Sequence, residues 1–285
     1  MNDGLTFVRT FDPAQITTLL CDADDNLFAS ERPAFEASTG VMNRFLARFG
    51  VTAPLDSEEL RKRAVGKNFR AMALALAVEC QLPLDPALAR GLPAAVVASV
   101  GDLASGNALS ADGLEQWVRE EREQVTAHLA VTLTPDPQVL GPLRDLAPHY
   151  ALAAVSSSAT KRLRACFAAT GIDSLIPEAA TFSAEDSLPV PTSKPDPAVY
   201  LHSGQVMGVA AEQGLAIEDS VAGLSSAVAA GYATVGNLMF VPPDERDCRR
   251  ADLIDAGAVA ITDSWRALAD VLLFSAVPAG GASLA

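Results

Sequence analysis

The most informative stretch of this chain is Ile16-Thr17-Thr18-Leu19-Leu20-Cys21-Asp22-Ala23-Asp24-Asp25-Asn26-Leu27-Phe28. Its first half is a short apolar, partly β-branched run, which is typical of a buried strand. The run ends in three carboxylates within four positions, which repel one another unless a cation or a cationic side chain neutralises them. Because strand side chains alternate, Asp22 and Asp24 are expected on one face. Open α/β sheets bind ligands at the carboxyl ends of their strands, so the stretch predicts a metal or phosphoryl site. The alternative is an acidic turn after an ordinary strand.

Composition limits the class of protein and its partners. The chain has 285 residues, of which 49% are apolar, which is enough for one large or two modest domains with a sizeable core. Its net charge of −14, from 35 acidic and 21 basic residues, argues against nucleic acid or an anionic membrane as a main partner. An uncharged apolar run of the length needed to cross a membrane is not expected anywhere in the chain.

The cysteines and the N-terminus suggest a compartment. Cys21, Cys80, Cys166 and Cys248 lie far apart and form no Cys-x-x-Cys pair, so we interpret them as reduced thiols of a cytoplasmic protein. The first eleven residues carry an acidic residue and no long apolar segment, which is unlike a secretory signal. No heptad repeat or interface stripe predicts an oligomeric state.

The order of expected elements predicts two domains. Residues 1–13 are interpreted as a lead-in arm before a strand at 16–22. From about residue 30 to 130 the pattern is helical throughout, without a strand and with a small polar loop at 101–113. Further strands are expected at 151–155, 181–182, 214–217, 233–235 and 259–261, alternating with helices. We therefore predict an α/β fold, a doubly wound parallel Rossmann-like sheet with an inserted all-α domain. The sheet domain is assigned to 1–28 and 131–285, and the inserted domain to 29–130.

Polar groups follow four of the expected strands or their loops. These are Asp22 and Asp24, the run Ser156–Ser158, Lys194, and the pair Glu218 and Asp219. All such ends of a parallel sheet face one edge, so residues nearly 200 positions apart can meet. Carboxylates can hold a hard cation such as Mg²⁺, while a hydroxyl and a lysine can hold phosphoryl oxygens. One carboxylate can attack phosphorus, and a second can exchange a proton with the leaving group and with water.

These residues resemble the motifs of the haloacid-dehalogenase-like (HAD) hydrolase superfamily, in its subfamily with a helical cap after the first motif. Asp22-Ala23-Asp24 resembles the first motif, Ser156 the second, Lys194-Pro195-Asp196-Pro197 the third, and Glu218-Asp219 the fourth. The resemblance covers about residues 16–270 and is to phosphoglycolate phosphatase-like and β-phosphoglucomutase-like proteins. It departs at Asp25-Asn26, where the family usually has Gly-Thr or Gly-Val.

The resemblance implies a role for each matched residue. Asp22 would be the nucleophile, forming an aspartyl-phosphate, and a Mg²⁺ ligand. Asp24 would be the general acid and base, with its backbone carbonyl reaching the metal. Asp219 would bind the metal, with Glu218 in or near its coordination sphere. Ser156 and Lys194, with Ser157, would bind the transferring phosphoryl group.

Two residues of the expected cap are weaker candidates. Lys67 and Arg70 follow Gly66 in a segment that faces the active site in capped relatives and can touch substrate. The alternative, equally favoured, is that both are exposed helix charges.

The resemblance implies a Mg²⁺-dependent phosphatase of a small phosphorylated metabolite, of the sugar phosphate or phosphoglycolate class. The alternative is a β-phosphoglucomutase-type phosphomutase, although such mutases carry a His where this chain has Ala34. A dehalogenase is disfavoured because its relatives lack an Asp at the position of Asp24. A phosphorylation-dependent receiver module has similar groups on a parallel sheet, but it lacks an inserted domain and is about half this length.

Overall fold

The computed structural model describes residues 4–64 and 67–276. The chain divides into two compact units. One is an α/β unit formed by the residues up to Ser30 and those from Leu133 onward, and the other, the helical unit, is Glu31–Thr132. Among the described residues, none of the helices combines the length and the hydrophobicity that a membrane span requires.

The α/β unit is built on a seven-stranded sheet in the order β1-β9-β8-β7-β2-β5-β6. All neighbouring strands are parallel except β1, which pairs antiparallel with β9. The central strand β2 lies between β5 and β7, with Cys21 opposite Ala154 and Ile217. The strands are β1 (Leu5–Phe7), β2 (Thr18–Cys21), β5 (Ala151–Ser156), β6 (Thr181–Ser183), β7 (Gly214–Glu218), β8 (Ala233–Asn237) and β9 (Ala260–Thr262).

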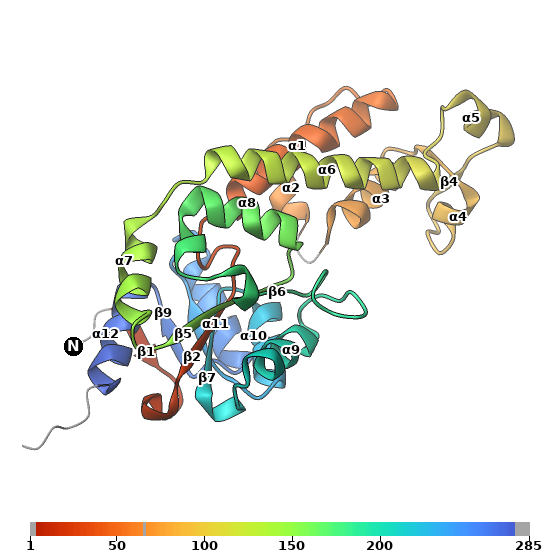
Figure 1. The fold of residues 1–285 in the computed structure, drawn as a ribbon. Helices are drawn as coiled ribbons and strands as arrows, with labels where there is room; N and C mark the ends of the chain where they lie inside the picture. The colour runs from red at the N-terminus through yellow and green to blue at the C-terminus, as the bar shows by residue number, and fades with distance from the viewer. Residues whose placement is uncertain (1–3, 65–66, 277–285) are drawn as a thin grey trace, which may run out of the picture. The chain divides into compact units, whose positions relative to one another are not determined.

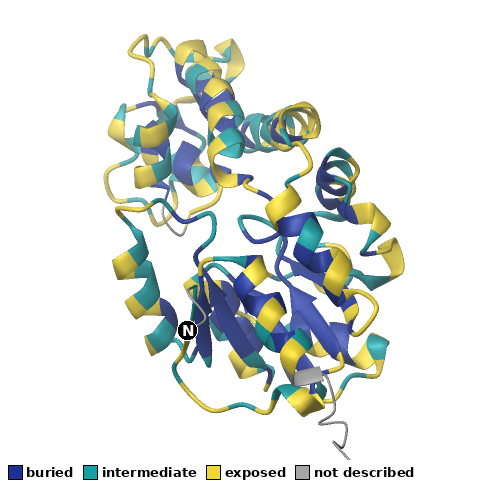
Figure 2. Cartoon of the chain, turned by 90° about the vertical axis from the view of Figure 1, so that its left-hand side faces the viewer, coloured by how far each residue is buried: buried dark blue, intermediate teal, exposed yellow. Residues whose placement is uncertain are grey.

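Helices cover both faces of this sheet, which explains why its central strands are buried on both sides and mostly apolar. All residues of β2 and β7 are buried, and Figure 2 shows the strands as the dark blue interior of the unit. One face packs against α9 and α10, whose Val199, Tyr200 and Ala227 contact side chains of β2, β5 and β7. Figure 1 shows α7 and α12 side by side on the opposite face.

Local signals set the ends of several helices around the sheet. Asp136 caps α7 and Ser220 caps α10, each accepting a backbone N–H of the first turn. Gly171 and Gly208 end α8 and α9 in the left-handed conformation. The helices of the unit are α7 (Pro137–Leu146), α8 (Thr160–Thr170), α9 (Ala198–Met207), α10 (Val221–Ala229), α11 (Arg246–Asp255) and α12 (Trp265–Ala276), and short 3₁₀ turns lie at Pro13–Gln15, Ile172–Ser174, Glu178–Ala180 and Ala211–Gln213.

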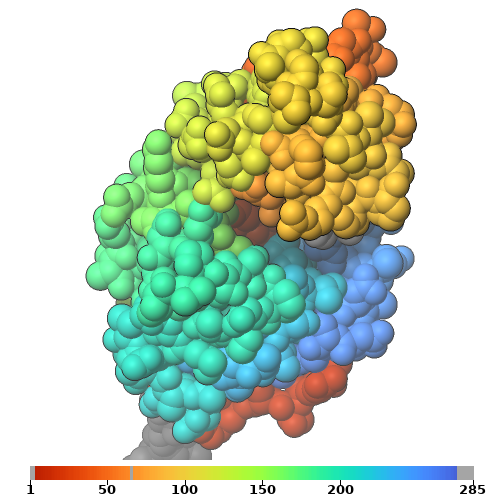
Figure 3. Space-filling view, turned by 90° about the vertical axis from the view of Figure 1, so that its right-hand side faces the viewer, coloured from red at the N-terminus to blue at the C-terminus, as the bar shows by residue number. Residues whose placement is uncertain are grey.

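The N-terminal segment is more than the predicted lead-in arm. Leu5–Phe7 forms the edge strand β1, and Leu5 lies opposite Thr262 of β9. Figure 3 shows the first part of the chain, in red, on the surface of the α/β unit beside its blue and cyan segments. The strand was missed because it has only three residues, too few for a recognisable alternation. The predicted small-residue tail at 275–285 lies almost wholly outside the described residues.

The helical unit contains α1 (Glu31–Arg48), α2 (Ser57–Arg63), α3 (Phe69–Glu79), α4 (Pro86–Ala89), α5 (Val100–Ser105) and α6 (Ala111–Thr132). Its core joins α1 to α6, where Phe45 and Trp117 meet edge to face with ring centroids 5.8 Å apart. Asp56, Asn68 and Asp85 cap α2, α3 and α4.

Two expectations for the helical unit were wrong. The unit is not wholly α-helical, because β3 (Pro83–Leu84) and β4 (Val96–Val97) form a small parallel sheet. Strands of two residues leave no sequence periodicity. The predicted loop at 101–113 contains most of α5, which begins in a capping box between Ser99 and Asp102 and ends at Gly106. The reciprocal cap compensates for the low helix propensity of a glycine in the first turn.

Candidate active site

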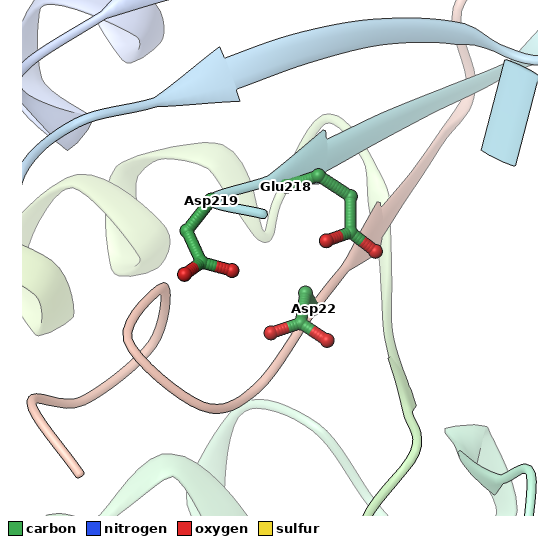
Figure 4. Close-up of side chains that lie close together, drawn as sticks. All are labelled: Asp22, Glu218 and Asp219. Carbon is green, nitrogen blue, oxygen red and sulfur yellow. The ribbon is translucent and has the colours of Figure 1, made fainter. Parts of the chain in front are cut away.

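Three carboxylates meet at the carboxyl edge of the sheet. Asp22 follows β2, while Glu218 ends the neighbouring strand β7 and Asp219 comes next. Asp22, Glu218 and Asp219 each bring a carboxylate oxygen to within 4.8 Å of the others. Figure 4 shows the three side chains gathered at the ends of their strands. The parallel register of β2 and β7 produces this cluster, because it places Cys21 beside Ile217 and therefore Asp22 beside Glu218.

Lys194 reaches the cluster from the loop between β6 and α9. Its ammonium group donates to the Asp22 carboxylate, to Glu218 Oε1 at 2.6 Å and to the Val155 carbonyl at 2.7 Å. The Lys194 side chain is only 5% exposed. A buried ammonium between two carboxylates is well placed to neutralise Asp22 and any further anion.

The electrostatics of the cluster call for more positive charge. Burial raises the pKa of Asp22, and the Glu218 carboxylate adds to the increase, although Lys194 opposes it. The pKa of Asp219 lies well above its ordinary value, first through burial and then through Asp22 and Glu218. Burial alone would lower the pKa of Lys194, but Asp22 and Glu218 raise it, so the ammonium stays charged. Lys194, together with the Arg249 guanidinium that opposes the increase in the pKa of Asp219, does not balance the three carboxylates, and a divalent cation would relieve the imbalance.

The cluster has the donor set of a hard metal ion. All three side chains offer carboxylate oxygens, the ligands that Mg²⁺ prefers. Glu218 Oε2 is buried and has no hydrogen-bond partner among the described residues, so the site contains an unsatisfied oxygen of the kind that a cation satisfies. The residues present therefore fit Mg²⁺. The Asp24 carboxylate is not part of this group.

Tyr200 contacts the acidic cluster, although the sequence did not single it out. Its buried hydroxyl donates to Glu218 Oε1 at 2.5 Å, the same oxygen that accepts from Lys194. The Lys194 ammonium also lies 5.2 Å from the centroid of the Tyr200 ring, within the range of a cation–π contact. Tyr200 stands on the first turn of α9, and an aromatic residue at that position reads from the sequence as ordinary core.

The predicted serines lie at the end of β5. Ser156 is the last residue of β5 and is buried, and its Oγ accepts the backbone N–H of Ser158 at 3.0 Å. Ser157 Oγ accepts the backbone N–H of Lys194 at 3.2 Å. The two serines are thus placed beside the Lys194 loop, with Val155, whose carbonyl binds Lys194, immediately before them.

Asp24 has a different set of partners from Asp22. Its carboxylate accepts from Ser158 Oγ at 2.6 Å, Ser30 Oγ at 2.6 Å and Arg162 Nη2 at 2.9 Å. The expectation that strand alternation places Asp22 and Asp24 on one face does not apply, because β2 ends at Cys21, before both residues. Burial would raise the pKa of Asp24, but the Arg162 charge and the serine hydrogen bonds outweigh it and lower that pKa.

The sequence did not single out Arg162 or Ser30 as partners of Asp24. Arg162 lies 138 positions after Asp24, on α8, and only the packing of α8 brings the two together. Ser30 lies directly before α1, and its hydroxyl donates to Asp24. These contacts favour the ionised form of the Asp24 carboxylate.

Asp25 accounts for the departure from the usual first motif. It adopts φ 51°, the left-handed region where relatives usually place glycine, and Asp tolerates this region better than most residues. Its carboxylate accepts the backbone N–H of Ser30 at 2.9 Å. The tight turn therefore falls on Asp25, the first of the two positions at which the sequence departs from the usual motif.

The two weaker candidates lie in the helical unit. Lys67 is exposed just before α3. Arg70 stands on α3 and forms an ion pair with Glu115 of α6, with Nη2 2.5 Å from Oε2. The pairing gives Arg70 a role within its own unit, and contact of either residue with substrate stays a prediction.

Comparison with solved structures identifies the fold. A predicted phosphoglycolate phosphatase from Haemophilus somnus 129PT matches with TM-score 0.63 and 22% identity, over 92% of this chain and 98% of that one. A HAD family hydrolase from Deinococcus radiodurans R1, with bound phosphate and sodium, matches with TM-score 0.62 and 23% identity, over 94% and 100%. A putative β-phosphoglucomutase from Thermotoga maritima matches with TM-score 0.60 and 21% identity, over 91% and 99%.

The predicted resemblance to HAD-like hydrolases is therefore confirmed at the level of fold, including the Rossmann-like sheet and the inserted helical unit. The sequence matches no protein-family model and no curated protein. At these identities the comparison establishes the fold, and the reaction has to be inferred from the chemistry of the site.

Proposed function

We propose that this protein is a Mg²⁺-dependent phosphatase of a small phosphorylated metabolite, of the sugar phosphate or phosphoglycolate class. The observation that supports it best is the position of Asp22, whose carboxylate contacts the Lys194 ammonium and lies in one cluster with Glu218 and Asp219. A carboxylate between an ammonium and a cation site is oriented for attack on an anionic phosphoryl group.

In the first half of the reaction, an Asp22 carboxylate oxygen forms a bond to phosphorus and the bond from phosphorus to the ester oxygen breaks. Lys194 and the hydroxyls of Ser156 and Ser157 bind the phosphoryl oxygens as charge redistributes. The leaving alkoxide takes a proton from Asp24. The structure shows Asp24 with three donors that favour its ionised form, so proton donation requires some of these contacts to be released.

In the second half, water attacks the phosphorus of the aspartyl-phosphate and the bond from phosphorus to the Asp22 oxygen breaks. Asp24 accepts the proton of the attacking water, a role suited to a carboxylate whose pKa is lowered. The products are inorganic phosphate and regenerated Asp22.

Asp22, Glu218 and Asp219, with the backbone carbonyl of Asp24, would hold the Mg²⁺. When bound, Mg²⁺ supplies positive charge that offsets the repulsion between the phosphoryl group and the nucleophilic carboxylate. The remaining neutralisation comes from Lys194.

Hydrolysis of 4-nitrophenyl phosphate tests the proposal. We expect turnover that requires Mg²⁺, stops with EDTA and is lost in Asp22→Asn. The matched control is Asp173→Asn, which removes the same charge from an exposed site of the α/β unit and should retain activity. Turnover that persists in Asp22→Asn or ignores EDTA would contradict the mechanism.

A phosphomutase is the second candidate, because one of the similar structures is a putative β-phosphoglucomutase. Both activities share the aspartyl-phosphate and differ in whether water or a sugar hydroxyl receives the phosphoryl group. Supplying β-glucose 1-phosphate separates them. A phosphatase releases free phosphate, whereas a mutase accumulates glucose 6-phosphate.

A further inference from the structure

Asn26 links the two strands that carry the acidic cluster. Its side chain is fully buried, and its Nδ2 donates to the Asp22 carbonyl at 2.8 Å and to the Ile217 carbonyl at 3.2 Å. The Ile217 carbonyl also accepts the Asp22 backbone N–H at 2.9 Å, the last link between β2 and β7. Asn26 therefore bridges the two strands at the point where Asp22 and Glu218 begin.

A second buried amide supports the first. Asn237, the last residue of β8, donates from Nδ2 to Asn26 Oδ1 at 2.7 Å, and its own Oδ1 accepts the Met239 N–H at 3.0 Å. The indole of Trp265 donates to the Asn26 carbonyl at 2.8 Å. The ends of β2, β7 and β8 are thus joined through the Asn26 and Asn237 amides. Trp265, at the start of α12, holds the backbone of Asn26.

The chemistry of these contacts requires an amide at position 26. The side chain uses two donors and one acceptor at once, whereas a hydroxyl offers one donor and a carboxylate offers none. A carboxylate there would face the carbonyl oxygens of Asp22 and Ile217 in a buried site. The same partners fix the orientation of the amide, since the reverse orientation would bring its oxygen against both carbonyls.

We infer that Asn26 and Asn237 are positioning residues that set the separation of Asp22 from Glu218 and Asp219, and thereby the affinity of the cluster for Mg²⁺. This inference depends on the metal site of the proposed function. Both side chains are fully buried and act through the strand ends. Groups that orient metal ligands in this way typically alter metal affinity about 10–100-fold when they are removed.

Calorimetric titration of the metal-free protein with MgCl₂, paired with thermal unfolding, tests the inference. We expect Asn237→Ala and the isosteric Asn26→Asp each to weaken Mg²⁺ binding by about 10-fold or more. Asn237→Ala leaves the stretch around Asp22 intact. If Asn26→Asp does not fold, Asn237→Ala and the milder Asn237→Ser still test the inference.

The matched control is Tyr150→Phe, which removes a buried hydrogen bond from Tyr150 to the Leu272 carbonyl in the same unit. It should lower the melting temperature and leave Mg²⁺ affinity unchanged. If the asparagine variants also lose stability but bind Mg²⁺ as the wild type does, the pair is merely structural and the inference is overturned. A wild type that fails to bind Mg²⁺ would instead overturn the metal site, and this inference with it.

Discussion

At the scale of single residues, two carboxylates two positions apart have opposite environments. Asp22 is buried beside Glu218, which raises its pKa, whereas Asp24 accepts hydrogen bonds from Ser158, Ser30 and Arg162, which lower its pKa. A pair of carboxylates whose pKa values are shifted in opposite directions can divide the roles of nucleophile and proton carrier.

Replacing Asp24 should separate the two halves of the proposed reaction. We expect Asp24→Asn to reduce hydrolysis of alkyl phosphates by about 10²–10⁴-fold, because the alkoxide no longer receives a proton. The 4-nitrophenolate leaving group needs no proton, so the variant should release one burst of 4-nitrophenol per enzyme before slow turnover. Rapid-mixing absorbance measures the burst. Equal losses with both ester types would argue against proton donation by Asp24.

The raised pKa of Asp22 predicts a pH-dependent effect of Mg²⁺ on stability. The pKa rises from 3.8 to about 8, so between these values the folded, metal-free protein retains a proton that the unfolded chain releases. Its stability therefore falls as the pH rises through this window. Mg²⁺ replaces the proton, so its stabilising effect should grow with pH.

Thermal unfolding with EDTA or Mg²⁺ at about pH 5.5 and about pH 8 measures this effect. The gain in melting temperature from Mg²⁺ should be larger at the higher pH, and Asp22→Asn should reduce the difference. A gain that is the same at both pH values would contradict the assignment.

At the scale of elements, the strand ends and the helix starts after them set the site geometry. Glu218 ends β7, and its side chain lies against the first turn of α10, where only a glycine fits. A Cβ at Gly223 would lie 1.9 Å from Glu218 Oε2. The absence of a side chain at Gly223 therefore leaves the space that the Glu218 carboxylate occupies.

Gly223→Ala should consequently displace Glu218, with a cost of about 1–3 kcal/mol in unfolding free energy and a large loss of activity. Gly40→Ala is the control, since α1 has space for the methyl group and no atom lies nearer than 3.8 Å. It should stabilise the protein by about 0.5–1 kcal/mol and leave activity unchanged. Denaturant unfolding and phosphatase assays decide between these outcomes.

Within the helical unit, one side chain orders the connection between α1 and α2. Asn43 donates to the Leu55 carbonyl and accepts the Leu55 N–H, both at 2.9 Å. Asn43→Ala should lose both bonds and cost about 1–3 kcal/mol, measured by denaturant unfolding. Asn43→Asp retains the acceptor and should cost less. An Asn43→Ala variant as stable as the wild type would show that solvent replaces the amide.

At the scale of the whole molecule, the net charge of −14 acts on stability. Excess acidic charge repels itself more in the compact state than in the unfolded chain, and salt screens this repulsion. Raising NaCl from about 0.01 M to about 0.2 M, with EDTA present, should therefore raise the melting temperature by a few degrees. A melting temperature that falls or stays constant would show that specific ion pairs outweigh the net charge.

The amino-acid sequence was enough to predict the fold class and the residues that end the central strands. Hydrophobic periodicity and turn residues are local features of a sequence. They were therefore enough to predict the strand before Asp22, the strand before Glu218 and the loop that carries Lys194. The sequence did not reveal β1, β3, β4 and α5, because segments of two to six residues are too short to show a periodic pattern.

The side chains that hold the residues of the site in place could be identified only from the three-dimensional packing. Arg162 beside Asp24, Tyr200 beside Glu218 and Asn237 beside Asn26 join positions separated by 18 to 211 residues. Such contacts depend on the order of strands in the sheet and on the packing of α8 and α9. No local pattern encodes them, because the same side chains elsewhere would read as a surface charge, a core aromatic and a turn residue.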